Sequence, residues 1–99
     1  ARNTVAGAPV LRTEDGQLVV TIPLDGPGVS GATDFFPEPQ EAFVIDHKSI
    51  AVAEGTITLR LTPYDSAARL KQLNGLVVYG KQGYRLSVYI RDTPEQISH

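Results

Sequence analysis

The sequence predicts a mainly β protein, a small single-domain β-barrel or sandwich of about six strands with one short helix before its C-terminal hairpin. Apolar and polar residues alternate with a period of two in several segments, which is typical of half-buried strands. Turn signals rich in glycine, aspartate and asparagine separate these segments at short intervals. A helical period occurs in one place only, at about residues 66–73, so strands dominate the prediction.

Length and composition bound the domain organisation. The chain has 99 residues, 41% hydrophobic and 20% charged, which predicts a single β-rich domain over residues 1–99. It has no cysteine, and this excludes disulfides, thiolate metal sites and cysteine nucleophiles. All of its apolar runs are far shorter than the roughly 20 residues of a membrane-spanning helix. We therefore expect a soluble protein with no membrane contact and a cytoplasmic location, although a disulfide-free exported protein would have a similar composition.

The first strands are predicted to form a hairpin. Residues 17–24 alternate from Leu18 to Leu24, so their aliphatic side chains share one face. Residues 10–13 are expected to pair with this strand, because Asp15-Gly16 lies between them and is a dipeptide that tight hairpin turns favour.

Residues 25–40 are predicted to be a long loop. Three glycines and three prolines interrupt this segment, and both residue types break regular structure. Loops of this length in small domains are usually functional or disordered. The loop contains the pair Phe35-Phe36, whose rings are expected either to cap the core or to contact a partner. Residues 93–99 are expected to be a flexible tail.

The middle of the chain predicts three further strands, at residues 42–45, 49–53 and 56–62, with a turn at residues 46–48. In the last of them, aliphatic residues alternate with threonines and Arg60, which favours one inward and one polar face. Threonine suits a strand because branching at its β-carbon costs rotamer freedom in a helix.

One short helix is expected over residues 66–73. Asp65 or Ser66 can cap its first turn, and two leucines spaced three apart would share its buried side. Asn74-Gly75 would end the helix, because both residue types readily adopt the left-handed conformation that closes one.

The C-terminal hairpin is predicted from residues 76–79 and 84–91 around a Gly-Lys-Gln-Gly turn. Its second strand has two chemically different faces. Alternation places Tyr84, Leu86, Val88 and Ile90 on one face and Arg85, Ser87, Tyr89 and Arg91 on the other. One face can therefore join the core while the other presents cations beside an aromatic ring.

The order of these elements is similar to that of an oligonucleotide-binding-type barrel, in which a helix closes one end between the third and fourth strands. This resemblance implies a surface for single-stranded nucleic acid. An SH3-like barrel or an open sandwich fits the same order of elements.

Charge is unevenly distributed along the chain. Residues 1–50 carry seven acidic and three basic side chains, whereas residues 60–91 carry six basic and one acidic. Such asymmetry can mark a surface that binds polyanions. It can equally mean that the two halves neutralise each other within the fold or across a self-association interface.

The sequence favours a non-enzymatic module for protein–protein interaction or assembly, with a homo-oligomer as the expected form. Phe35-Phe36 and the polar face of the last strand are its candidate contact surfaces. The candidate partner-binding residues are Phe35, Phe36, Lys81, Arg85, Tyr89 and Arg91.

The alternative is a β-barrel that binds single-stranded nucleic acid through the same hairpin. Cations that follow phosphates and aromatic rings that stack on bases are what such binding needs. Lys81, Arg85, Tyr89 and Arg91 supply both residue types.

No catalytic, cofactor or metal motif is recognised, so we expect no enzyme activity, no cofactor and no metal. Asp34, Glu38, Glu41 and His47 are the side chains that an active site would have to use. Such a site would need two of them to converge in one pocket, and their spacing does not require this.

Overall fold

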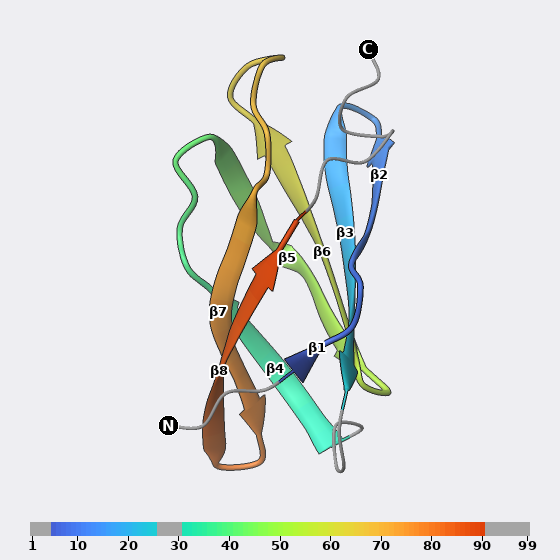
Figure 1. The fold of residues 1–99 in the computed structure, drawn as a ribbon, viewed down its shortest axis with the longest axis vertical. Coiled ribbons are helices and arrows are strands. Elements are labelled where there is room, and N and C mark those ends of the chain that lie inside the picture. Colours follow the sequence, from blue (N-terminus) through green and yellow to red (C-terminus); the bar gives the residue numbers. More distant parts are fainter. Residues whose placement is uncertain (1–4, 26–30, 91–99) are drawn as a thin grey trace.

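The computed structural model describes residues 5–25 and 31–90. These residues form eight strands: β1 (Val5–Ala6), β2 (Val10–Glu14), β3 (Gln17–Asp25), β4 (Ala32–Pro37), β5 (Phe43–Ala53), β6 (Thr56–Pro63), β7 (Gln72–Tyr79) and β8 (Gln82–Tyr89). They are arranged as two antiparallel sheets (Figure 1). The five-stranded sheet has the order β1-β3-β6-β5, with β2 also paired to β3, and the three-stranded sheet has the order β4-β7-β8. The predicted mainly β class is confirmed.

The buried apolar side chains of both sheets, apart from Val19, belong to one hydrophobic cluster. The five-stranded sheet contributes, among others, Leu18, Val20, Ile22, Leu24, Ile57, Leu59 and Leu61. The three-stranded sheet contributes Phe35, Leu73, Val77, Leu86 and Val88. In the view of Figure 1, β7 and β8 cross in front of β5 and β6. Each sheet therefore has one face in the common core and one outer face.

Tight hairpins connect the long strands. Asp15-Gly16 joins β2 to β3, and its residues have φ of 52° and 78°. Glu54-Gly55 joins β5 to β6 with φ of 52° and 75°. Two successive positive φ angles give the turn whose twist matches that of the paired strands, so the predicted first hairpin is confirmed. The last hairpin turns at Gly80-Lys81, with φ of 63° at the glycine.

β5 is one continuous strand, so the turn predicted at residues 46–48 is wrong. The register between β5 and β6 shifts between Asp46 and Ala51, and the extra residues form a bulge. Within it, the Ser49 hydroxyl donates to the carbonyl of Asp46 at 2.6 Å and accepts the N–H of Arg60 at 2.8 Å. The serine thereby supplies the hydrogen-bond partner that a regular ladder would provide, and the strand continues.

The loop predicted over residues 25–40 is wrong for much of its length, because β4 forms there and pairs with β7. Phe35 faces the core, with 1% of its surface exposed, and Phe36 faces outward. β4 lies at an edge of its sheet, where Pro37 is tolerated because an edge strand needs fewer N–H donors. Residues 26–30 lie outside the described residues.

The helix predicted over residues 66–73 is also wrong. Oδ1 of Asp65 accepts the N–H of Ala67 at 2.8 Å, and its carbonyl accepts the N–H of Ala68 at 3.2 Å. These contacts close a single turn, and β7 then begins at Gln72. The capping chemistry is present, but the turn does not propagate into a helix.

Gly75 is the reason why the first half of β7 is not recognised as a strand from the sequence. It takes an inward position between Leu73 and Val77, and all three are buried. A Cβ at Gly75 would lie 2.6 Å from both the ring of Phe35 and the carbonyl oxygen of Phe36. The glycine thus makes room for the Phe35 ring, and it also interrupts the apolar alternation by which the strand would be recognised.

The two chemically different faces of the last strand are confirmed for residues 85–90, whereas Tyr84 is only partly buried and Arg91 lies outside the described residues. Leu86, Val88 and Ile90 are buried, whereas Arg85 and Tyr89 are exposed. The predicted tail at residues 93–99 lies outside the described part of the chain. Across residues 5–25 and 31–90 there is no helix with the length and apolarity that a membrane crossing requires.

Candidate interaction surface

The outer face of the three-stranded sheet brings three different side chains into one row. Phe36 of β4 is paired with Leu76 of β7, and Leu76 is paired with Arg85 of β8. Directly opposite residues on one face of an antiparallel sheet have Cβ atoms about 4.5–5.5 Å apart. An aromatic ring, an aliphatic side chain and a cation therefore follow one another across the whole sheet.

Much of this row is open to solvent. Phe36 is 56% exposed and Leu76 is 40% exposed. Tyr89, which lies on the same outer face of β8, is 72% exposed, and Val78 of β7 is half-buried. We call Phe36, Leu76, Val78, Arg85 and Tyr89 the outer patch. Phe36 and Leu76 are direct neighbours, whereas Tyr89 lies beyond the intervening pair of Ser87 and Asn74. Neighbouring exposed apolar side chains are a stronger indication of an interface than scattered ones.

The cations near the outer patch are not neutralised within the described residues. Both ion pairs found there involve Glu14, which lies on the other sheet. Arg85 and Lys81 are exposed and form neither of these pairs. The acid on β4, Asp34, is in a neighbouring row, and its Oδ1 accepts the N–H of Phe35 at 2.8 Å. Within the described ranges, the positive charge of Arg85 is therefore not balanced by an ion pair.

Only some of the residues predicted to bind a partner lie together in the structure. Phe36, Arg85 and Tyr89 share the outer patch, which brings the aromatic pair of the predicted loop next to the polar face of the hairpin. Phe35 is buried and contributes to the core instead. Arg91 lies outside the described residues.

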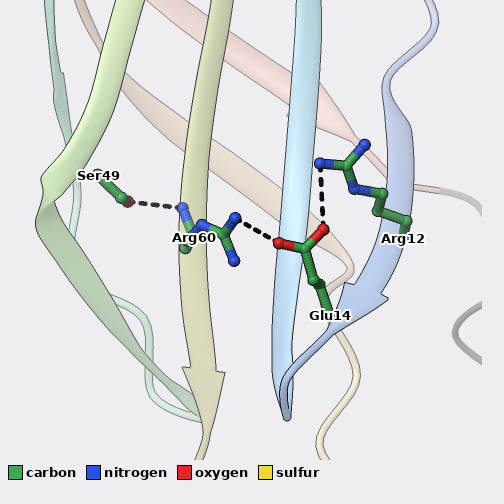
Figure 2. Close-up of polar contacts among 4 residues, drawn as sticks. All are labelled: Arg12, Glu14, Ser49 and Arg60. Carbon is green, nitrogen blue, oxygen red and sulfur yellow. Dashed lines mark hydrogen bonds and ion pairs between the residues drawn. The ribbon is translucent and has the colours of Figure 1, made fainter.

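On the outer face of the five-stranded sheet, the charged side chains pair with one another, as Figure 2 shows. Nη2 of Arg60 donates to Oε1 of Glu14 at 2.6 Å, and Nη2 of Arg12 lies 3.4 Å from Oε2 of the same carboxylate. The hydrogen bond from Arg60, its positive charge and that of Arg12 lower the pKa of Glu14. The same contact raises the pKa of Arg60. This pair joins the acidic first half of the chain to the basic second half.

The two arginines also flank an apolar residue on that face. Val19 is 3% exposed but does not belong to the core cluster. Its partners in the register are Arg12 on one side and Arg60 on the other. Long basic side chains commonly cover apolar surface with their aliphatic stems. We infer that the arginines bury Val19 while their charges are held by Glu14.

The side chains considered for catalysis do not form a site. Asp34, Glu38, Glu41 and His47 are all exposed. No hydrogen bond or ion pair joins any two of them within the described ranges. Those ranges also contain no group of three or more side chains that could hold a metal ion.

A cavity of about 140 Å³ lies where the turn after β6 meets the β2–β3 hairpin. Its ionisable lining residues are Asp65 and Arg69. Asp65 is used by the turn described above, and Nη1 of Arg69 donates to the carbonyl of Ala68 at 3.0 Å. Both charged groups therefore stabilise the local chain, and the cavity presents no pair of groups suited to acid–base chemistry.

Leu76 and Val78 belong to the outer patch but are not among the residues predicted from sequence. Their outward positions in a strand could be read from local alternation. Their proximity to Phe36 depends on the pairing of β4 with β7, which local alternation does not reveal.

A comparison with protein-family models finds no match to this chain, and no curated protein is significantly similar to it in sequence. We therefore argue function from the surfaces of this chain alone.

Proposed function

We propose that this chain is a non-enzymatic protein-interaction module that self-associates, with the outer patch and its β8 border as the contact surface. The exposed row of Phe36, Leu76 and Arg85, with Tyr89 on the same face, is the observation that carries the proposal. Aromatic residues and arginine are enriched in protein interfaces and dominate their binding energy. Complete burial of a phenylalanine side chain is worth roughly 1.5–3 kcal/mol, so a partner on this face would gain appreciable free energy.

The other exposed apolar side chains do not offer an equivalent surface. Val10 lies on β2 and Val44 on β5, and two strands separate them in the sheet. Tyr64 follows the end of β6. Single exposed apolar residues are common on monomeric proteins, and they need no partner.

We infer that the two sheets stack as a sandwich instead of closing into a barrel. In support, the ladders of the described strands run within each sheet, and one cluster of buried side chains draws on both. A sandwich leaves an outer face and edges on each sheet available for contacts. A cytoplasmic location belongs to the same proposal, in keeping with a composition free of cysteine.

The proposal is tested by the molar mass in solution, measured by size-exclusion chromatography with light scattering. We expect the wild-type chain to exceed its monomer mass of 10.7 kDa, at low and high salt alike, because burial of apolar surface is not screened. The double variant Phe36→Ser with Tyr89→Ser is expected to shift the mass toward the monomer.

The matched control is Val10→Ser with Tyr64→Ser, which removes two side chains that are exposed to a similar extent, 62% and 68%, but lie off the outer patch. This control is expected to keep the wild-type mass. Equal dissociation of both double variants would contradict the proposal, and so would a wild-type chain that stays monomeric at millimolar concentration.

Single-stranded nucleic acid is a second candidate ligand, favoured by the exposure of Tyr89 on the same strand face as Arg85, which forms no ion pair within residues 5–25 and 31–90. Stacking of a base on an aromatic ring contributes roughly 1–3 kcal/mol. A labelled oligonucleotide followed by fluorescence anisotropy should then bind with an affinity that falls as salt rises. Arg85→Ala should reduce the slope of log K against log salt by about one. Absence of binding at low salt would eliminate this candidate.

A further inference from the structure

The hydrogen bonds of β8 leave one set of its backbone groups pointing away from the sheet. The N–H of Ile90 donates to the carbonyl of Lys71 at 2.8 Å, so residue 90 points toward β7. In an antiparallel pair, successive residues of a strand point alternately toward the partner and away from it. The N–H and C=O groups of Arg85, Ser87 and Tyr89 therefore point toward the free edge of β8.

These edge-facing groups have no backbone partner among the described residues. β8 is the last strand of its sheet and is paired with β7 alone. β1 lies nearby, but its pairing is with β3, and the following Gly7 donates to the carbonyl of Pro23 at 2.7 Å. β1 thus contacts β8 without pairing with it, and among the described residues the backbone groups along this edge are free to pair with another strand.

Among the other edges, β5 and β4 carry features that hinder pairing, and β2 is five residues long and carries the charged Arg12 and Glu14. β5 is interrupted by its bulge, next to which Asp46, His47 and Lys48 lie in sequence. β4 has a register shift between Ala32 and Asp34 and ends in a proline. Bulges, prolines and charges are the devices by which proteins protect sheet edges. β8 has a regular register with β7 along its whole length, no proline, and Arg85 as its single charge.

We propose that a second copy of this chain pairs with β8 through this edge, as two antiparallel β8 strands related by a two-fold axis at Ser87. The inference rests on the proposed function and places the contact at its β8 border, with Arg85 and Tyr89 of the outer patch in the interface and Phe36, two strands away, outside it. The pairing would join the two three-stranded sheets into one continuous six-stranded sheet. The outer patches of both copies would then form a single surface.

Side-chain chemistry favours a register centred on Ser87 over one centred on Arg85. A pairing centred on Arg85 would place two guanidinium groups directly opposite each other, and like charges in that arrangement repel. A pairing centred on Ser87 places each Arg85 opposite the Tyr89 of the second copy, so that a cation meets the face of an aromatic ring. On the inner side, Leu86 lies opposite Val88 of the second copy. The strand is therefore self-complementary, as a two-fold interface requires.

Ser87→Pro tests this geometry in the intact chain. The N–H that proline removes points toward the free edge, so the ladder between β7 and β8 keeps all of its hydrogen bonds. Pairing with a second copy loses two central hydrogen bonds, one from each chain. We expect the dimer dissociation constant, measured by analytical ultracentrifugation, to rise by at least about tenfold, the effect of roughly 1.4 kcal/mol.

Ser87→Lys is the second variant, and it tests the edge pairing of β8 even if the proline variant fails to fold. Two lysines would oppose each other at the axis, so the dimer should weaken at low salt and recover in part at high salt. The matched control is Asn74→Lys, which makes the same charge change on β7 directly opposite Ser87 but one strand farther from the axis. This control is expected to remain dimeric.

Dissociation of both Ser87 variants with a dimeric control supports the edge pairing. If the Ser87 variants stay dimeric while Phe36→Ser with Tyr89→Ser dissociates, the edge pairing is overturned and the proposed function stands with a different contact geometry. A wild-type chain that is monomeric throughout overturns both.

Discussion

The outer faces of the two sheets differ in whether their arginines form ion pairs among the described residues. On the five-stranded sheet, Glu14 holds Arg12 and Arg60, and the arginines flank a buried valine. On the three-stranded sheet, Phe36 is open to solvent and Arg85 forms no ion pair among the described residues. Arg12 and Arg60 are thus paired within the chain, and the other outer face is the one that we propose contacts a partner.

The edges of the two sheets also differ, in how far they are protected against pairing with another strand. β5 borders the five-stranded sheet with a bulge and adjacent charges, whereas β8 borders the three-stranded sheet with a regular row of backbone groups that no described residue pairs. A protein that only needed to remain monomeric would be expected to protect both edges. The interaction surface that we propose accordingly lies on the smaller sheet, at its outer face and at β8.

The two sheets differ at their outer faces, so we expect the stability of the fold to be equally sensitive to substitutions on their inner faces. Leu59→Ala in β6 and Leu86→Ala in β8 each remove a fully buried side chain, and each should lower the free energy of unfolding by about 2–5 kcal/mol. Arg85→Ala, the neighbouring outward change, should alter it by less than about 0.5 kcal/mol. Chemical denaturation measures all three. An Arg85→Ala effect as large as that of Leu86→Ala would mean that the faces of β8 are wrongly assigned.

Gly75→Ala should disturb both faces of the smaller sheet at once. The added methyl would lie 2.6 Å from the Phe35 ring and from the carbonyl of Phe36, so the core must repack and β4 must shift. We expect a loss of roughly 1–3 kcal/mol in the free energy of unfolding. Gly31→Ala is the matched control, since a Cβ there meets no atom within 4 Å. Equal losses of stability in both variants would argue against the tight packing of Phe35.

The smallest expected effect is electrostatic and belongs to the larger sheet. The folded-state pKa of Glu14 is lowered, so its pairing stabilises the fold above the ordinary glutamate pKa of about 4.3. This stabilisation is lost as the pH falls through the lowered pKa, because the folded protein then binds the proton. Glu14→Gln should therefore show a shallower loss of stability in acid than the wild type.

The difference between wild type and Glu14→Gln should shrink at 1 M salt, because the pair is solvent-exposed and screened. Thermal unfolding between about pH 2 and pH 6 measures it. Identical acid slopes for the two proteins at low salt would show that the arginines do not hold the carboxylate in solution.

Local sequence patterns were sufficient for the parts of the fold that depend on nearest neighbours. The alternation of β3, β6 and β8 and the turn at Asp15-Gly16 each follow from residues adjacent in the chain. The exposed face with Arg85 and Tyr89 was predicted for the same reason.

The parts that depend on distant residues could not be predicted in this way. β4 lies in a segment rich in chain breakers, and the start of β7 contains Gly75, which resembles a helix stop until Phe35 is placed over it. The outer patch requires knowing that Phe36 faces Leu76, two residues 40 positions apart in sequence. Strand pairing between such segments is set by tertiary contacts and not by local propensity.

Amide hydrogen exchange, resolved by residue at low and high protein concentration, is the most direct test of where the molecule makes its contacts. We predict that the edge-facing amides of Arg85, Ser87 and Tyr89 exchange more slowly as concentration rises, while the amides along β2 and β5 are unchanged. Slowing confined to β2 or β5, with no change along β8, would contradict the assignment of the smaller sheet as the contact surface.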